Sequence, residues 1–147
     1  MPFDEELVES LRDRFPEDVK EAEVVKPGRV RATLSREALR SVCLFLRDDM
    51  NFEHISCISG VDWIEYMENV YHIVSYERNC VIQLNVRIPS SDPVADTVSD
   101  IWKGALYHER EAYDLLGIDF KGHPDLRRIL LPQDFKFHPL RKDYQGE

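Results

Sequence analysis

Apolar and polar residues follow two different periodicities at the start of the chain. Leucines recur at helical spacing in FDEELVESLRDRF, and acidic residues occupy its first turn, so we expect a helix over residues 3–15 that ends before Pro16. EAEVVKPGRVRATL instead alternates apolar and polar positions on both sides of the turn dipeptide Pro27-Gly28. This alternation predicts a β-hairpin over residues 21–34.

Ser35 is the expected N-cap of a second helix, because REALRSVCLFLRDDM over residues 36–50 carries one apolar stripe. Three β-rich runs separated by polar breaks follow, over residues 52–64, 69–77 and 80–89, and the last two form an expected hairpin. The order α-β-β-α-β-β-β, with two helices on one face of a five-stranded sheet, predicts a two-layer α+β domain. The helical connection permits a parallel strand pair, so the sheet is expected to be mixed.

The last third of the chain has weaker patterning. A further helix is expected to begin at Asp92 and Pro93 and to end at Gly117, with Gly104 dividing it. Beyond that helix, only RRILLP over residues 127–132 is a candidate strand. We therefore expect one domain with three segments: a two-layer α/β part over 1–90, a helical segment packed on or beside it over 91–120, and an extended partner-binding tail over 121–147.

Charge and cysteine content limit the classes of function and the cellular setting that this chain can have. A net charge of −9 argues against nucleic-acid binding, which depends on clustered Lys and Arg. The charge is uneven, because residues 1–120 carry 13 basic and 24 acidic side chains whereas residues 121–147 carry 6 and 4. No apolar run is long enough for a membrane span, so membrane association is expected only through partners. Cys43, Cys57 and Cys80 form no CxxC pair, which favours reduced, cytosolic core cysteines.

Histidines raise the alternative of a metal-dependent or acid–base enzyme. His108 and Glu111 lie at i,i+3 spacing, which places them on one helical face, and His123 or His138 could add a ligand. The usual metal-binding helix has His at i and i+4 or a repeated Glu-x-x-His, and neither pattern occurs here. The sequence therefore favours no metal and no cofactor in this chain.

The acidic residues in and after the sequence His-Glu-Arg-Glu, residues 108–111, can be interpreted as catalytic or as structural. Glu109, Glu111 and Asp114 could do acid–base work if like charges raise one pKa. The spacing of Arg110 and Asp114 instead predicts an i,i+4 ion pair on an exposed or partner-facing side. The expected apolar side of the same helix consists of Leu106, Tyr113 and Leu116.

The tail has the composition of a recognition segment. Proline removes a backbone donor and disfavours helix in the residue before it, so His123-Pro124 and His138-Pro139 predict extended chain lying along a surface, its own or a neighbour's. Arginine matches carboxylates with two parallel hydrogen bonds, and ILLP supplies apolar anchors. The charged tail residues expected to take part are Asp125, Arg127, Arg128, Arg141, Lys142 and Asp143.

The ordered motifs ERE, YDLLGI, GHPDLRRILLP and HPLRKDY closely resemble the C-terminal signature of the C-type subunit of NADH:quinone oxidoreductase, respiratory complex I, and of its counterparts in related F(420)H(2) dehydrogenase and membrane-bound hydrogenase complexes. That family's domain also has the order α-β-β-α-β-β-β. The resemblance covers residues 107–144 by motif and the preceding part only by element order.

The resemblance implies a non-catalytic, cofactor-free subunit of the peripheral arm, on the cytoplasmic side of the membrane. Its expected partners are a large D-type subunit and B-type and I-type subunits that carry iron–sulfur clusters, while the electron donor, whether NADH, F(420)H(2), ferredoxin or hydrogen, binds elsewhere. The implied interface residues are His108, Glu109, Arg110, Glu111, Asp114, His123, Pro124, Asp125, Arg127, Arg128, His138, Pro139, Arg141, Lys142, Asp143 and Tyr144.

Two departures from the family pattern bear on the tail. Phe137 stands where the pattern has Gly before the second His-Pro, so the turn there is expected to differ. The sequence ends three residues after Tyr144, whereas many bacterial relatives continue. That length favours a compact version of the subunit from an archaeal or hydrogenase-type complex.

Overall fold

The computed structural model describes residues 2–131 and 138–142, and its first elements match the predicted ones. Helix α1 spans Phe3–Arg14 and is followed by strands β1, Val19–Lys26, and β2, Arg29–Leu34. The two strands pair antiparallel, and Gly28 turns the chain between them with φ 78°, a conformation that glycine adopts without steric cost. The predicted helix and hairpin are therefore confirmed.

The second helix begins differently from the prediction. A single 3-10 turn, η1, covers Arg36–Ala38 before α2 runs over Leu39–Met50. Ser35 precedes the turn, but its hydroxyl donates to Asp18 Oδ1 at 3.0 Å and makes no capping hydrogen bond. The position of the helix is confirmed, and the capping role of Ser35 was wrong because a nearby carboxylate competes for the hydroxyl.

Three long strands complete the main sheet: β3, His54–Asp62; β4, Tyr66–Ser75; and β5, Cys80–Pro89. The strand order is β1-β2-β5-β4-β3, in which only β2 and β5 pair parallel. That parallel pair follows from the crossover through α2, which takes the chain from β2 to β3 at the far edge of the sheet. The predicted mixed five-stranded sheet and the β4–β5 hairpin are confirmed.

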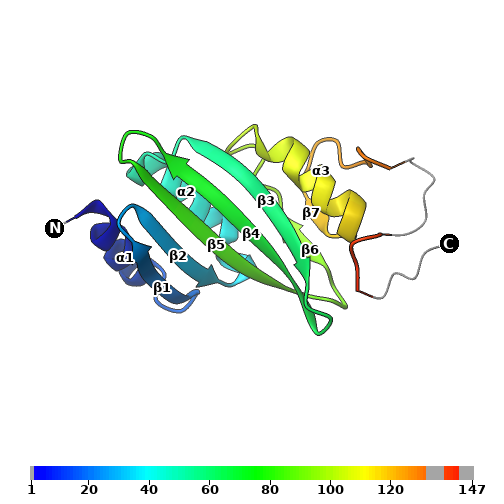
Figure 1. Cartoon of the computed structure of the whole chain (residues 1–147), viewed down its shortest axis with the longest axis horizontal. Helices are drawn as coiled ribbons and strands as arrows, with labels where there is room; N and C mark the ends of the chain where they lie inside the picture. Colours follow the sequence, from blue (N-terminus) through cyan, green and yellow to red (C-terminus); the bar gives the residue numbers. More distant parts are fainter. Residues whose placement is uncertain (1, 132–137, 143–147) are drawn as a thin grey trace.

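The main core lies between this sheet and helices α1 and α2, which cover one of its faces (Figure 1). Strand β5 turns one side towards this core, because its buried residues alternate with more exposed ones along the whole strand. Leu84 is fully buried at its centre, opposite Tyr71 of β4. Burial of such side chains supplies the main favourable free energy of folding, on the order of 2 kcal/mol each.

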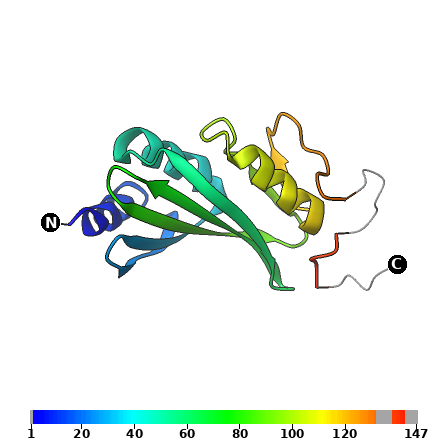
Figure 2. The same cartoon turned by 45° about the horizontal axis from the view of Figure 1, so that its top comes forward.

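The chain after β5 departs from the prediction. Residues 92–104 are not helical: β6, Val94–Asp96, pairs parallel with β7, Asp119–Lys121, and only α3, Ala105–Leu116, is a helix. The predicted helix start at Asp92 and Pro93 was wrong, because β6 pairs with a strand that follows the helix. Helix α3 packs beside β3 (Figures 1 and 2) and encloses a second, smaller core. The buried members of that core are Met67, Ile88, Ala95, Ala112, Leu116, Ile118 and Phe120.

Candidate functional site

Helix α3 carries the acidic motif, and its buried side includes carboxylates as well as apolar groups. Gly117 ends the helix at φ 74°, and its N–H donates to Tyr113 O at 2.9 Å, as predicted for a left-handed stop. The side chains of α3 that are buried are Ala105, Glu109, Ala112, Asp114 and Leu116. The prediction that these acidic residues lie on an exposed or partner-facing side was therefore wrong for Glu109 and Asp114, which are buried within the chain.

Glu109 is fully buried against the loop that follows β6. Its carboxylate accepts hydrogen bonds from the Thr97 hydroxyl and from the Val98 N–H at 2.8 Å. Burial raises the pKa of Glu109 to about 7, although these two donors act in the opposite direction. Glu109 thus joins α3 to the segment that links β6 to it.

His123 is another buried polar group of this region. Its side chain is fully buried, with Nε2 3.1 Å from Leu106 O and 3.9 Å from Glu109 Oε1. Its Nδ1 accepts from the Asp125 N–H at 2.9 Å, so the proton of the neutral ring lies on Nε2 and is donated to the carbonyl. The first His-Pro pair therefore fixes the start of the tail on α3.

Asp114 holds the next part of the tail. Its carboxylate pairs with Arg128 Nη1 at 2.7 Å and accepts the backbone N–H groups of three successive residues. These donors are Ile129 at 3.1 Å, Leu130 at 2.6 Å and Leu131 at 3.0 Å. Burial raises the pKa of Asp114, but the bonds from Arg128 and these N–H groups outweigh it and bring the pKa below its ordinary value.

These bonds correct two predictions. Asp114 pairs with Arg128 and not with Arg110, whose guanidinium donates to the carbonyls of Arg127 at 3.2 Å and Arg128 at 3.0 Å. Residues 127–131 form no strand, and a side chain, not a neighbouring strand, accepts the backbone N–H groups of residues 129–131.

The end of α3 is closed by the part of the tail that returns at residues 138–142. The last carbonyls of a helix have no partner within the helix. Asp114 O accepts from Arg128 Nη1 at 2.8 Å and from His138 Nδ1 at 3.1 Å, and Leu115 O accepts from the Leu140 N–H at 3.0 Å. Leu116 O accepts from Arg141 Nε at 2.6 Å. Cations are favourable at this end of the helix dipole, so the tail and the helix complement each other.

His138 lies in a site that favours its neutral ring. Burial lowers the pKa of this ring, the positive charges of Arg141 and Arg128 lower it further, and the bond to Asp114 O acts against them. The ring also packs edge-on against Tyr113, with centroids 6.5 Å apart. The second His-Pro pair therefore lies on α3, as the first does.

The candidate metal ligands do not form one cluster. Among residues 2–131 and 138–142, no three His, Cys, Asp or Glu side chains are placed to hold a metal ion. Both nitrogens of His123 are engaged by the backbone, and His138 Nδ1 faces a carbonyl. His108 and Glu111 lie on α3, where Glu111 is half-buried, and do not join these two rings.

The remaining predicted interface residues divide by exposure. Asp125 and Arg127 form an ion pair at 3.0 Å on the surface, with side chains 57% and 59% exposed. Pro124 and Lys142 are also exposed, and Pro139 is half-buried. Asp143, Tyr144 and Phe137 lie outside the residues that the structure describes.

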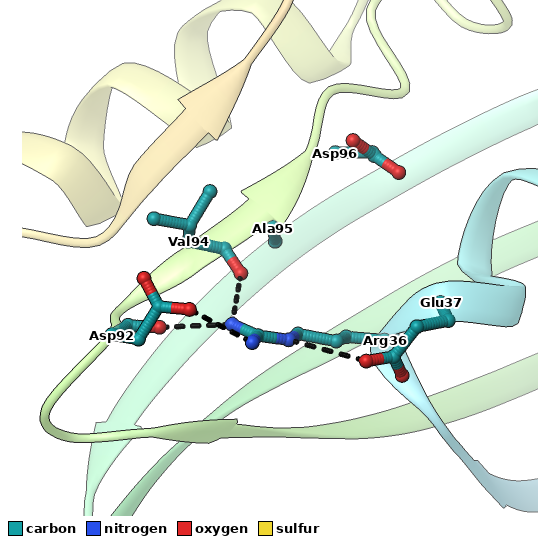
Figure 3. A pocket seen from close by; sticks show the side chains of 6 residues that line it. All are labelled: Arg36, Glu37, Asp92, Val94, Ala95 and Asp96. Atoms are coloured by element: carbon teal, nitrogen blue, oxygen red, sulfur yellow. Dashed lines mark hydrogen bonds and ion pairs between the residues drawn. The ribbon is translucent and has the colours of Figure 1, made fainter.

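Two arginines of the η1–α2 segment contribute contacts that the sequence did not indicate. Arg36 donates to Asp92 O at 2.9 Å and Val94 O at 3.0 Å and pairs with the Asp92 carboxylate (Figure 3). Arg40 donates to Thr97 O at 2.8 Å and pairs with both oxygens of Asp100. Figure 3 shows the Arg36 guanidinium lining the hollow beside β6 and bonded to Asp92 and Val94, so these donors are used within the chain.

Residues 32–147, which include α3 and the whole tail, match the protein family described as "Respiratory-chain NADH dehydrogenase, 30 Kd subunit". The chain belongs to this family. The C subunit of F(420)H(2) dehydrogenase from Methanosarcina mazei is 40% identical over 143 residues, covering 95% of this chain and 90% of the relative. The C subunit of NADH-quinone oxidoreductase from Geobacter sulfurreducens is 36% identical over 138 residues, covering 91% and 85%. The resemblance indicated by the tail motifs is thereby confirmed.

Solved structures share the fold of this chain. The trypsin-resistant fragment (1-134) of Nqo5 aligns with a TM-score of 0.71 and 30% identity, covering 86% of this chain and 100% of the fragment. A chain of the membrane-bound sulfane sulfur reductase, an archaeal respiratory membrane complex, aligns with a TM-score of 0.83 and 26% identity, covering 96% and 85%. Among the described residues of the present chain, no helix is long and apolar enough to cross a membrane.

Proposed function

We propose that this chain is the C-type subunit in the peripheral arm of a complex I-like, ion-translocating oxidoreductase and that it scaffolds electron transfer towards quinone without catalysing a step itself. The observation that carries the proposal is the family match over residues 32–147 together with similarity to C subunits along nearly the whole chain. We place its partners as the large D-type subunit and the cluster-bearing B-type and I-type subunits. The iron–sulfur clusters and the electron-donor cofactor belong to those partners, and this chain lies on the cytoplasmic side of the membrane through them.

The geometry of the tail supports a scaffolding role. Asp114 and Arg128 are buried within the chain, so they act by giving the tail its shape. Arg127, Leu130 and other exposed tail groups are the ones that a partner can contact. A segment that is ordered before it binds loses less conformational entropy on association, which favours tight and specific docking.

A second candidate concerns which complex the chain serves. The relative from Methanosarcina mazei is named as a subunit of F(420)H(2) dehydrogenase and is 40% identical over 95% of this chain. This similarity favours an F(420)H(2)-type assembly over an NADH-type or hydrogenase-type one. The electron donor would bind to another subunit, so the composition of the assembly decides among the three.

Copurification from the native cells tests the proposed function. A tagged chain should bring a D-type subunit and cluster-bearing subunits with it, and the subunit that receives electrons names the complex. The purified chain alone should show no redox activity and no stoichiometric metal. A chain that carries a metal lost in His108→Ala, or that copurifies with no D-type subunit, would contradict the proposal.

Arg127→Ala tests the tail as the interface. If the guanidinium faces a buried carboxylate of the partner, its loss weakens association by about 2–5 kcal/mol. Arg31→Ala is a matched control, because Arg31 is also a surface arginine paired with an acid, Glu23, but lies on β2. Equal retention of both variants in the assembly would reject the tail as an interface.

A further inference from the structure

The turn between β3 and β4 exposes two large apolar side chains next to each other. Trp63 is 53% exposed and Ile64 is 72% exposed. The turn lies at the end of the sheet beside the tail segment 138–142 (Figures 1 and 2). Scattered exposed apolar residues are ordinary, but an adjacent tryptophan and isoleucine at the tip of a hairpin form a continuous apolar projection.

The backbone of this turn is strained. Ile64 has φ 76°, in the left-handed region, and a β-branched residue in that region is a genuine outlier. Glycine or asparagine would occupy the same position at lower cost. Such strain persists only where the surrounding structure fixes it, and it marks positions retained for function more than for stability.

Four hydrogen bonds fix the turn. Trp63 N–H donates to Tyr66 O at 2.9 Å, and Ile64 N–H donates to Asp62 Oδ1 at 2.8 Å. The Ser90 hydroxyl donates to Ile64 O at 3.3 Å. The indole Nε1–H of Trp63 donates to Glu68 Oε1 at 3.3 Å, which orients the ring. The two apolar side chains are therefore presented on a rigid support, which lowers the entropy cost of binding a partner.

The turn is continuous with the tail. Asp62 is buried, and its second carboxylate oxygen accepts the Lys142 N–H at 2.8 Å. Ile64, Ser90 and Arg141 line one shallow hollow with Asp62 and Lys142. One carboxylate thus shapes both the turn and the end of the described tail, so the two form a single surface.

The charges around the projection indicate the kind of partner. Glu65 is exposed next to Ile64 and Glu68 lies beside the indole, whereas the cations Arg141 and Lys142 lie on the tail side of the hollow. These carboxylates repel the anionic headgroups of a membrane and attract Lys and Arg on a protein surface. Tryptophan in an apolar pocket is a frequent centre of binding energy in protein interfaces.

We propose that Trp63 and Ile64 dock into an apolar socket with a basic rim on a neighbouring protein subunit of the same assembly. The inference rests on the proposed function, because the neighbour is a subunit of the complex in which this chain is placed. It adds a second contact, on the β3–β4 turn, to the contact expected of the tail.

Rebinding to the assembly tests the docking surface. The native assembly, depleted of this chain, is titrated with purified chain that carries Trp63→Ala, Ile64→Gly or no substitution. We expect each substitution to weaken rebinding at least tenfold. Tyr76→Ala is the matched control, because Tyr76 is 68% exposed at the opposite end of β4, and it should rebind within twofold of the unsubstituted chain.

Ile64→Gly separates docking from folding. Glycine relieves the positive φ, so this variant should have a higher melting temperature than the unsubstituted chain while it binds the assembly less well. If Ile64 had only a structural role, a substitution that raises the melting temperature would not weaken binding. Glu65→Lys should weaken rebinding about threefold or more at low salt, because it places a cation against the basic rim.

Failure of the docking surface can be told apart from failure of the proposed function. If the unsubstituted chain does not rebind, the proposed function fails. If it rebinds and Trp63→Ala and Ile64→Gly rebind equally well, the proposed function stands and the docking surface is rejected. Two other results would also overturn the inference. If the chain sediments with anionic phospholipid vesicles and both substitutions abolish this, a membrane is the occupant. If the chain forms a dimer in the ultracentrifuge and both substitutions abolish it, a second copy is the occupant.

Discussion

The part of the chain up to β5 and the part after it are held together by different interactions. In the first part, α1 and α2 bury a continuous apolar core against the sheet, and its buried positions follow strand and helix periodicity. In the second part, residues 98–105 add Val98, Ile101, Trp102 and Ala105 to that core, and beyond them a second apolar core is small and buried carboxylates that accept backbone N–H groups shape the chain. Periodicity in a sequence therefore reveals the first kind of structure and not the second.

The two parts should also respond differently to damage. Removal of one member of a buried ion pair takes away the compensation of a buried charge, whereas truncation of a core side chain leaves a cavity. The first effect should stay near the tail, because the bonds of the Asp114 carboxylate to other described residues lie within residues 128–131. The second should lower the stability of the whole chain.

Asp114→Ala should have the largest effect. It removes the carboxylate that pairs with the Arg128 guanidinium and that accepts three backbone N–H groups, which costs about 4 kcal/mol locally. Trypsin should then cleave after Arg128, which is buried in the unsubstituted chain. Unchanged proteolysis of the tail would show that Asp114 does not hold it.

Leu84→Ala should destabilise the first part by about 3 kcal/mol, because Leu84 is fully buried in the main core. Urea unfolding followed by circular dichroism measures the effect. The control is Val25→Ala, at a side chain 51% exposed on β1, which should change the free energy of unfolding by less than about 0.5 kcal/mol. A tail that opens before the rest of the chain in Leu84→Ala would show that the two parts do not respond separately.

Glu109 makes the second part sensitive to pH. Its pKa is raised from 4.5 to about 7 on folding, so the folded chain binds the proton more tightly than the unfolded chain. The stability from this group is full below pH about 4.5 and is lost as pH rises through about 7. Glu109→Gln stays neutral and should gain about 3 kcal/mol relative to the unsubstituted chain across that window. A pH-independent difference in urea unfolding would contradict this reasoning.

Two matched substitutions compare the two parts with only a small loss of stability in each: Gly117→Ala and Gly28→Ala. Both glycines have positive φ, 74° and 78°, so alanine costs about 1 kcal/mol at either position. A Cβ at Gly117 would lie 2.7 Å from Arg141 Nη2 and 2.8 Å from His138 Cδ2. Only Gly117→Ala should therefore increase trypsin cleavage in the tail, and equal cleavage in both variants would count against the contact.

The sequence predicted the first part well because each of its elements carries its own pattern. The helix at residues 3–15, the hairpin around Gly28 and the three long strands needed only local periodicity and turn residues. The mixed sheet followed from the order of elements alone.

The second part could not be predicted in the same way. Nothing near β6 shows that its partner is β7, which follows α3. The acceptors for the N–H groups of residues 129–131 are the oxygens of one side chain, Asp114, so the apolar run ILLP resembled a strand. Arg36, Arg40 and Asp62 act across long sequence separations, and their charge alone gave no signal.

Amide hydrogen exchange of residues 129–131 shows most directly whether Asp114 orders the tail before any partner binds. In the isolated chain, these amides should be protected, and Asp114→Ala should accelerate their exchange at least about a hundredfold, since about 2.7 kcal/mol corresponds to that factor. The amides of β5 should exchange at unchanged rates. Unprotected amides at 129–131 in the unsubstituted chain, or an equal acceleration in β5, would show that Asp114 does not order the tail.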